Sequence, residues 1–313
     1  MGRINELDYI RVVAVVAVLM CHYFLFSNLN SGVGRYLGGI GNTIFFLTSA
    51  LLYSFKPVVG GGDFVLKRVL KLGFSLWSFL LILFILYLIF AVNFSLVNIV
   101  LNFAFLGYVF KLPGNGHLWF LTVLMSCYVE MIILDRLNIK SKYFPFLLLF
   151  SSIVLSGIAE YFHVSCVAFF SMGFYGFVFL KGKWLYKYSK SIGGWNTLFA
   201  IIINIICLYF DYNGLFEYNR FLHYLLTSFC GLFLLVVMLK FMPNLKINVV
   251  SFICGISYEF YLVHHTFCAG PFIRITSWEY SHILNILVIV VLSVISAWVL
   301  NLLGKQLKVI FLK

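Results

Sequence analysis

Apolar segments long enough to cross a bilayer follow one another along almost the whole chain. Hydrophobic residues make up 63% of the 313 residues, charged residues only 10%, and the mean hydropathy is +1.04. Soluble domains do not have such an excess of hydrophobic over charged residues, whereas runs of about 20 apolar residues are typical of transmembrane helices. The sequence therefore predicts an all-α integral membrane protein.

The apolar segments are evenly spaced, and no polar linker divides them. We expect a single domain over residues 1–313, built as a bundle of about ten transmembrane helices. The expected spans are 10–28, 37–55, 68–92, 117–135, 143–160, 164–180, 196–210, 221–241, 247–268 and 282–303.

Three further features of the apolar pattern bear on this organisation. Ser95, Asn98 and Asn102 follow at i, i+3 and i+7, which favours a helix lying in the membrane interface over another crossing. The first span lacks a small-residue cleavage pattern, so we expect it to remain in the mature protein. No extracytoplasmic catalytic domain is expected beyond residue 313.

The net charge of +12 is dispersed between the spans, so it indicates membrane topology and not a nucleic-acid partner. Lys and Arg are retained in cytoplasmic loops. Successive connections between the spans lie on alternate sides of the membrane, and the 22 Lys and Arg residues are distributed very unequally between the two sides. One side holds only Arg35, Lys111, Arg220 and Arg274. Both termini are therefore predicted to be cytoplasmic.

The 7 cysteines all lie within apolar segments and show no CxxC spacing. This pattern predicts small buried hydrophobic residues, and we expect neither disulfides nor a metal site.

The first span carries two ionisable side chains, Arg11 and His22. They are separated by close to three helical turns, so they share one helix face at about 16 Å along the axis. Ionisable groups in lipid are costly and face protein or water, so we expect both to face one cavity and to carry function. Alternatively, Arg11 anchors its helix by snorkelling to the inner headgroups, and His22 is a neutral histidine satisfied by one interhelical hydrogen bond.

Arg68 and Lys71 lie one turn apart at the predicted cytoplasmic start of the third span. They predict a cationic inner mouth, although positive-inside bias by itself also places cations there. Asp8 lies one turn before Arg11 and is positioned to pair with it.

Histidines and aromatic residues gather toward the predicted outer ends of the spans. His117 and Trp119 begin the fourth span after the turn-rich stretch 113–116, and His264 and His265 close the ninth. Trp at a membrane interface is also an ordinary anchor.

The segment 255–264 adds a polar stripe to the ninth span. Ser257, Tyr261 and His264 fall at i, i+4 and i+7 on one helix face, and Glu259 between them needs a hydrogen-bond partner or water.

Taken in order, these motifs resemble the membrane-bound acyltransferase 3 family, whose members O-acylate carbohydrates and related cell-envelope molecules. The segment 5–24 is similar to the family's opening helix, in which an Arg is followed after ten residues by a His. The segment 43–53 resembles its FF-x-x-SG pattern, with Phe45, Phe46 and Ser49 matching and Ala50 in place of Gly. HLWFL at 117–121 and GISYEFYLVH at 255–264 resemble two later motifs, so the resemblance runs almost end to end.

The start of the third helix departs from the family pattern. Lys67-Arg68-x-x-Lys71 stands where the family has Arg-x-x-Arg, and Lys71 lacks the bidentate fork of arginine. Phe74 occupies the usual Pro position, and Leu124 stands where one branch of the family has an acidic residue.

The resemblance implies an acyltransferase for groups other than amino-acyl groups, working as an O-acetyltransferase in a bacterial inner membrane. It would take the acyl group from cytoplasmic acyl-CoA, above all acetyl-CoA, as co-substrate without a bound cofactor, and pass it to a hydroxyl of a carbohydrate or glycolipid acceptor. His22 is expected to be the catalytic base, or the nucleophile of an acyl-histidine intermediate, with Arg11 also catalytic. Arg68 and Lys71 are expected to bind the CoA phosphates. Acceptor-binding or oxyanion roles are expected for Ser49, His117, Trp119, Ser257, Tyr258, Tyr261 and His264.

Two other classes of function fit the same sequence. A non-enzymatic exporter or flippase of polysaccharide or lipid-linked sugar would also use a polar stripe through a helix bundle. A structural membrane scaffold leaves the intramembrane Arg11 and His22 without a role.

Overall fold

The computed structural model describes residues 4–27, 29–56, 60–139, 141–217 and 219–311, and these residues form helices and loops with no strand among them. Arg3, Lys140 and Lys313, which contribute to the predicted topology, lie outside the described residues. The all-α prediction is confirmed for the part of the chain that is described. The helices are α1 (Glu6–Phe26), α2 (Ser31–Ser54), α3 (Gly61–Ile89), α4 (Leu96–Phe103), η1 (Gly116–Leu118), α5 (Trp119–Leu137), α6 (Phe144–Tyr161), α7 (Val167–Ser191), α8 (Gly194–Tyr212), α9 (Arg220–Phe241), α10 (Asn248–Gly255), α11 (Ser257–Ala269), η2 (Ile275–Ser277) and α12 (His282–Phe311).

By length and composition, 8 helices of the described chain are candidates to cross a membrane, fewer than the ten spans expected from sequence. They are α1, α2, α3, α5 with η1, α6, α8, α9 and α12. The expected sixth span is part of α7, which continues to Ser191 and carries four lysines in its second half. The expected ninth span is divided between α10 and α11.

The break between α10 and α11 occurs at Ile256, whose φ of −108° and ψ of 7° are not helical. Ser257 donates a hydrogen bond from Oγ to the Cys254 carbonyl at 2.8 Å, so a side chain takes up a carbonyl beside the break. Periodicity alone does not report such a break, because both halves keep the same apolar character. Irregular backbone at membrane depth is tolerated where it lines a cavity, and Cys254, Gly255 and Ser257 do line one.

The stretch after α3 contains a short helix, as the Ser95 pattern predicted. Ser95 caps α4 by accepting from Asn98 N at 3.4 Å. With 8 residues, α4 is about 12 Å long and cannot cross a bilayer. Whether it lies in the interface stays a prediction.

Close packing of α1 on α2 fixes the position of the first span. Gly34, Gly38 and Gly41 of α2 face α1, and a Cβ at Gly38 would lie 2.5 Å from Cys21 Sγ. Small residues let two membrane helices approach closely and hold each other by van der Waals contact. His22 follows Cys21 in α1, so the position of the predicted base depends on how α1 packs on α2.

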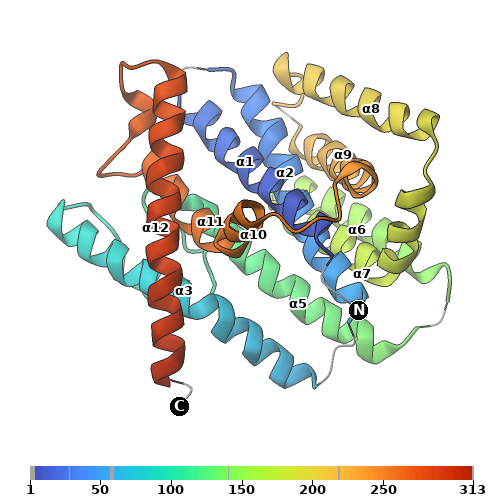
Figure 1. Cartoon of the computed structure of the whole chain (residues 1–313), viewed down its shortest axis with the longest axis horizontal. Coiled ribbons are helices and arrows are strands. Elements are labelled where there is room, and N and C mark those ends of the chain that lie inside the picture. Colours follow the sequence, from blue (N-terminus) through green and yellow to red (C-terminus); the bar gives the residue numbers. More distant parts are fainter. Residues whose placement is uncertain (1–3, 28, 57–59, 140, 218, 312–313) are drawn as a thin grey trace.

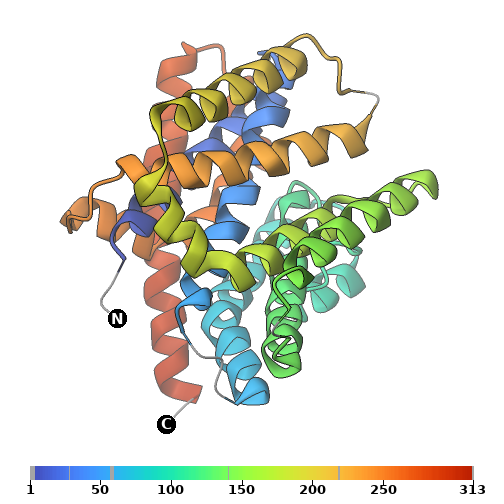
Figure 2. The same ribbon diagram turned by 90° about the vertical axis from the view of Figure 1, so that its right-hand side faces the viewer.

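Two helices meet at the end of the bundle where the chain finishes. α12 runs along one side of the molecule, α3 crosses it, and the start of α3 lies toward the same end as the last residues of α12 (Figures 1 and 2). A Cβ at Gly304 would lie 2.7 Å from Ser75 Oγ, so α12 and α3 are in tight contact there. The opposite face of α12 is apolar and exposed, with Val291 54% and Ile295 53% exposed, as expected for a lipid-facing surface.

Candidate active site

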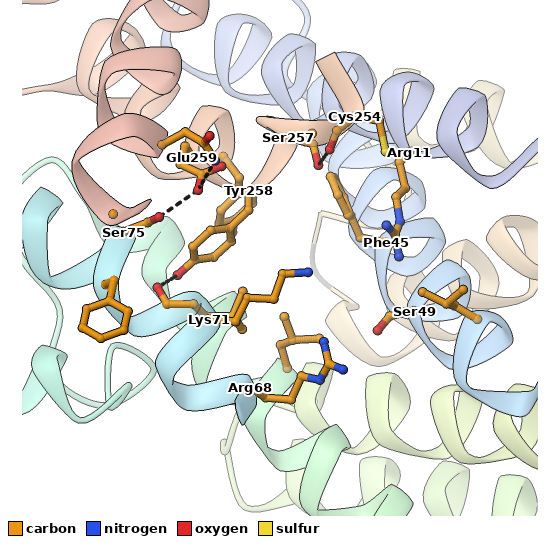
Figure 3. A pocket seen from close by; sticks show the side chains of 18 of the residues that line it. Arg11, Phe45, Ser49, Arg68, Lys71, Ser75, Cys254, Ser257, Tyr258 and Glu259 are labelled. Atoms are coloured by element: carbon orange, nitrogen blue, oxygen red, sulfur yellow. Dashed lines mark hydrogen bonds between the residues drawn. The ribbon is translucent and has the colours of Figure 1, made fainter. Parts of the chain in front are cut away.

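A cavity of about 600 Å³ lies between α1, α2, α3, α5, the break before α11, and α12 (Figure 3). We call it the cationic cavity because six positively charged side chains line it and Glu259 is the one carboxylate among its lining residues. The cations are Arg11, Lys56, Arg68, Lys71, Lys305 and Lys308. Lys56, Lys71, Lys305 and Lys308 are exposed, so the lysines mark its opening to solvent.

Arg68 is held between two aromatic rings. Its guanidinium carbon lies 4.9 Å from the ring centre of Tyr53 and 4.9 Å from that of Phe64. Cation–π contacts of this kind orient the planar group. The Nε of Arg68 is buried and has no hydrogen-bond partner among the described residues. The guanidinium is thus oriented while it retains a free donor for a ligand.

Arg11 enters the cavity from the other side, beside Cys254 (Figure 3). The Cys254 thiol donates to Asp8 Oδ1 at 3.3 Å, which ties the residues beside the helix break to the first turn of α1. The predicted pairing of Asp8 with Arg11 stays a prediction.

The buried Glu259 carboxylate has hydrogen-bond partners, as its place within an apolar segment led us to expect. Ser75 Oγ donates to Glu259 Oε1 at 2.7 Å, and Asn301 Nδ2 donates to the same oxygen at 3.0 Å. The buried carboxylate therefore joins α11 to α3 and α12 at the wall of the cavity. Figure 3 shows it on the far side of the cavity from Arg11 and Ser49.

The hydroxyls at the α11 wall give their protons to backbone carbonyls. Tyr258 donates to the Leu72 carbonyl at 3.0 Å and Tyr261 to the His117 carbonyl at 2.7 Å, as Ser257 does to Cys254. A hydroxyl has a single proton to donate. Ser49 differs, because its contact is with the Tyr128 hydroxyl at 3.5 Å, at the limit for a hydrogen bond.

Four imidazoles gather on the other side of Tyr261, and we call His22, His117, His264 and His265 the histidine cluster. His265 is central: its ring centre lies 4.4 Å from that of His22 and 4.6 Å from that of His117. His264 lies 5.2 Å from His22 and 5.5 Å from His117. These rings come from α1, η1 and α11, segments far apart in the sequence.

Backbone carbonyls hold three of the four rings. His117 Nε2 is bonded to the Leu262 carbonyl at 3.2 Å, and His265 Nδ1 to the Gly114 carbonyl at 2.6 Å. His264 Nδ1 contacts the Phe260 and Tyr261 carbonyls at 3.1 and 2.8 Å. Since a carbonyl only accepts, each of these nitrogens carries the ring's proton. His22 Nδ1 is buried and has no hydrogen-bond partner among the described residues.

The cavity and the cluster are neighbours but they are not one space. The Tyr261 ring lines the cavity and lies 5.3 Å from His117 and 5.6 Å from His264, while Phe45 and Phe120 complete this end of the cavity. We expected Arg11 and His22 to face one cavity, and this detail is wrong: Arg11 lines the cationic cavity and His22 does not. The aromatic layer of Phe45, Phe120 and Tyr261 separates them.

All but one of the predicted site residues belong either to the cationic cavity or to the histidine cluster. Trp119 lies in neither group, and its ring contacts Phe120 at 6.2 Å. Sequence reasoning counted Lys56, Lys305 and Lys308 as topology signals only, and it assigned no role to His265. The signal for His265 was its place next to His264, two imidazoles in succession near one end of a span.

Comparison with protein-family models gives a match to an acyltransferase domain over residues 4–302. Comparison with curated proteins and with solved structures gave no match. The matched range contains the whole histidine cluster and all residues of the cationic cavity except Gly304, Lys305 and Lys308. The chain therefore belongs to the acyltransferase 3 family, and it is a membrane acyltransferase.

Proposed function

We propose that this protein is an O-acyltransferase that moves an acyl group, in the first place acetyl, from cytoplasmic acyl-CoA to a hydroxyl of a cell-envelope carbohydrate or glycolipid. The observation that carries the proposal is the cationic cavity, which leads from exposed lysines to an aromatic layer with the histidine cluster behind it.

The charge of the cavity suits the donor. Coenzyme A carries a diphosphate and a separate phosphate at one end, and an uncharged pantetheine arm ends in the thioester. Six cations against one carboxylate leave a strong positive excess for such a polyanion. The lysines at the opening would hold the nucleotide, and Arg11, Arg68 and Lys71 would face the deeper phosphates and the arm.

His22 is the proposed catalytic base. As the acceptor oxygen attacks the thioester carbonyl carbon, its proton passes to His22, which imidazole accomplishes near neutral pH. When the tetrahedral intermediate collapses, the C–S bond breaks and the thiolate sulfur takes the proton from His22. The products are the ester and free CoA. An acyl-histidine intermediate would use His22 as the nucleophile in two successive transfers.

The oxyanion needs donors that have no other partner. The hydroxyls of Ser257, Tyr258 and Tyr261 already donate to carbonyls, so in this arrangement they serve as walls. The hydrogen bond of the Ser49 hydroxyl is the longest, at 3.5 Å, and Arg68 Nε has no hydrogen-bond partner among the described residues. We propose Ser49, with a guanidinium behind it, as the first choice for this role.

The topology completes the proposal. We propose ten crossings: the eight candidate helices, together with α7 and the broken pair α10–α11, which do not meet the criterion of length and apolarity. We also propose that the membrane is a bacterial inner membrane and that both termini lie in the cytoplasm. The cavity mouth, carrying Lys56, Lys71, Lys305 and Lys308, would then face the cytoplasmic pool of acyl-CoA.

The test is thioester consumption by the purified protein in lipid nanodiscs. With acetyl-CoA and a panel of envelope glycans, free CoA thiol is expected to appear only when an acceptor is present, together with an acetylated glycan in the mass spectrum. His22→Ala at equal expression is the control. Glycan movement across vesicles without thiol release would contradict the proposal and support an exporter or flippase.

A further inference from the structure

A second cavity, of about 460 Å³, adjoins the opening of the cationic cavity. It lies between the end of α2, the last turns of α5 and the middle of α7. Tyr53 and Lys56 line both cavities, so the two spaces meet at these side chains. We call the second space the side cavity, and its other polar lining residues are Ser54, Asp135, Asn138 and Lys183.

The side cavity differs in chemistry from the cationic cavity. Among its described lining residues two cations, Lys56 and Lys183, stand against one carboxylate, Asp135. Asn138 adds an amide, and Phe179 belongs to an apolar part of the wall. The lining includes no residue of the histidine cluster or of the aromatic layer. The side cavity therefore suits a molecule of modest negative charge with an apolar face, and the acyl group does not reach the proposed base from it.

Two local features fix the walls of the side cavity. Asn138 follows the last residue of α5 with a φ of 43° and a ψ of 43°, a left-handed conformation that Asn adopts more readily than most residues. A Cβ at Gly182 would collide with the Ser54 side chain, so α7 packs tightly on α2 beside the cavity. Ligand sites are usually formed in advance by such fixed elements.

We propose that the side cavity binds the adenosine 3′-phosphate end of acyl-CoA, while the cationic cavity takes the diphosphate and the pantetheine arm. The inference rests on the proposed function. The single ribose phosphate carries less charge than the diphosphate, and the two cavities differ in positive charge in the same order. Lys56, which lines both cavities, would then stand between the two phosphate positions.

Adenine accounts for the uncharged part of the lining. An Asn amide can pair with the N6 and N7 atoms of adenine, and a carboxylate can accept from an exocyclic amino group. Aromatic side chains stack on the face of any base. Asn138, Asp135 and Phe179 supply these three kinds of group, and Lys183 is left for the phosphate. A phospholipid headgroup would also suit the lysines, but it offers no ring to stack on Phe179.

Three acetyl donors separate these contacts. They are acetyl-CoA, acetyl-3′-dephospho-CoA, which lacks only the ribose phosphate, and acetyl-pantetheine, which lacks the nucleotide and the diphosphate. The ratio kcat/KM is measured for each donor in nanodiscs of zwitterionic lipid. Lys183→Ala should lower kcat/KM about tenfold for acetyl-CoA and leave the other two values unchanged, because a charge-assisted contact with the ribose phosphate is lost.

A second variant tests the base. Asn138→Gly removes the amide and keeps the left-handed backbone, which Gly adopts without strain. It should lower kcat/KM about tenfold for acetyl-CoA and for acetyl-3′-dephospho-CoA, since both carry adenine. The value for acetyl-pantetheine should stay unchanged, which also shows that the variant is folded.

The matched control is Lys187→Ala, which removes an exposed lysine one turn further along α7 that lines neither cavity. It should leave all three values unchanged. For Lys183→Ala, full kcat/KM with acetyl-CoA, or equal losses with all three donors, would overturn the assignment of the side cavity. A loss that appears only when anionic lipid is added would overturn it as well and indicate a lipid headgroup. Absence of thiol release by the unaltered protein with every donor would instead overturn the proposed function.

Discussion

At the scale of single residues, chemically similar side chains do different work according to their surroundings. Arg68 lies between two aromatic rings with a free Nε, whereas Lys71 on the same helix face is exposed at the cavity opening. A guanidinium stacks and donates in a fixed plane, while an ammonium acts as a mobile point charge. The family pattern with two arginines is thus altered here at the exposed position.

Arg68→Lys should therefore be costly although it preserves charge. We expect the KM for acetyl-CoA to rise about tenfold, because stacking on Tyr53 and Phe64 is lost. Lys71→Arg is the matched control and should change KM little. Initial rates over a range of acetyl-CoA concentrations measure both, and equal effects at the two positions would contradict the assignment.

His22 and Arg11 give the sharpest residue-level expectation. His22→Ala should abolish acetyl transfer, a loss of about a hundredfold to ten-thousandfold for a general base, while expression and unfolding temperature stay near those of the unaltered protein. Arg11→Ala should impair transfer severely as well. Normal turnover in Arg11→Ala would return that residue to membrane anchoring.

At the scale of helices, the last helix contributes more than a crossing. α12 packs on α3 through Gly304 and Ser75, and within the next turn it supplies Lys305 and Lys308 to the cavity. Asn301 on the same helix holds Glu259. The C-terminal part of α12 is therefore a wall of the candidate donor site.

Removal of both lysines should weaken donor binding without affecting chemistry. For Lys305→Ala with Lys308→Ala, we expect the KM for acetyl-CoA to rise about tenfold, its salt dependence to become shallower, and kcat to stay unchanged. The matched control is Lys240→Ala, at the end of α9, which contacts the Ile192 carbonyl and not the cavity. A fall in kcat with normal KM would show that the pair acts on catalysis.

At the scale of the whole molecule, the aromatic layer divides the site into two compartments. Phe120 packs on Phe46 at 4.4 Å and on Tyr261 at 4.8 Å, between the cationic cavity and the histidine cluster. In the proposed reaction, the thioester would have to pass or displace this layer. Until then the layer would separate the thioester from water near His22.

Phe120→Ala should therefore uncouple the reaction. We expect CoA thiol release without an acceptor to increase, with acetate as the second product, and acetyl transfer to the glycan to fall. Phe146→Ala is the control, because Phe146 is 54% exposed on α6 and lies away from the layer. Thiol release that still depends fully on acceptor in Phe120→Ala would show that the layer does not restrain hydrolysis.

The orientation of the bundle is a prediction of the same scale. Reporter fusions at the C-terminus should show green fluorescent protein fluorescence and no alkaline phosphatase activity, because the lysine-rich connections are predicted to stay in the cytoplasm. Active phosphatase at that position would place the cavity mouth outside and remove the access of cytoplasmic acyl-CoA.

Hydrophobicity, charge bias and motif spacing predicted the helical membrane class, most helix positions and many of the ionisable residues of the candidate site, but gave no site role to Lys56, Lys305, Lys308 or His265. Hydrophobicity and charge bias act locally along the chain, so they can be read without knowing contacts. The same local nature explains what was not foreseen. The break at Ile256 and the lysine-rich second half of α7 leave these two segments short of the length and apolarity criterion for a crossing.

Which polar groups share a space follows from the packing of the helices. Arg11 and His22 lie on one helix, yet the aromatic layer of Phe45, Phe120 and Tyr261 assigns them to different compartments. His265 entered the site because α11 packs against α1 and the loop before α5, and carbonyls of that packing fix the tautomers around His22. Helical periodicity gives the direction of a side chain from its own axis, whereas its partners depend on the packing of all the other helices.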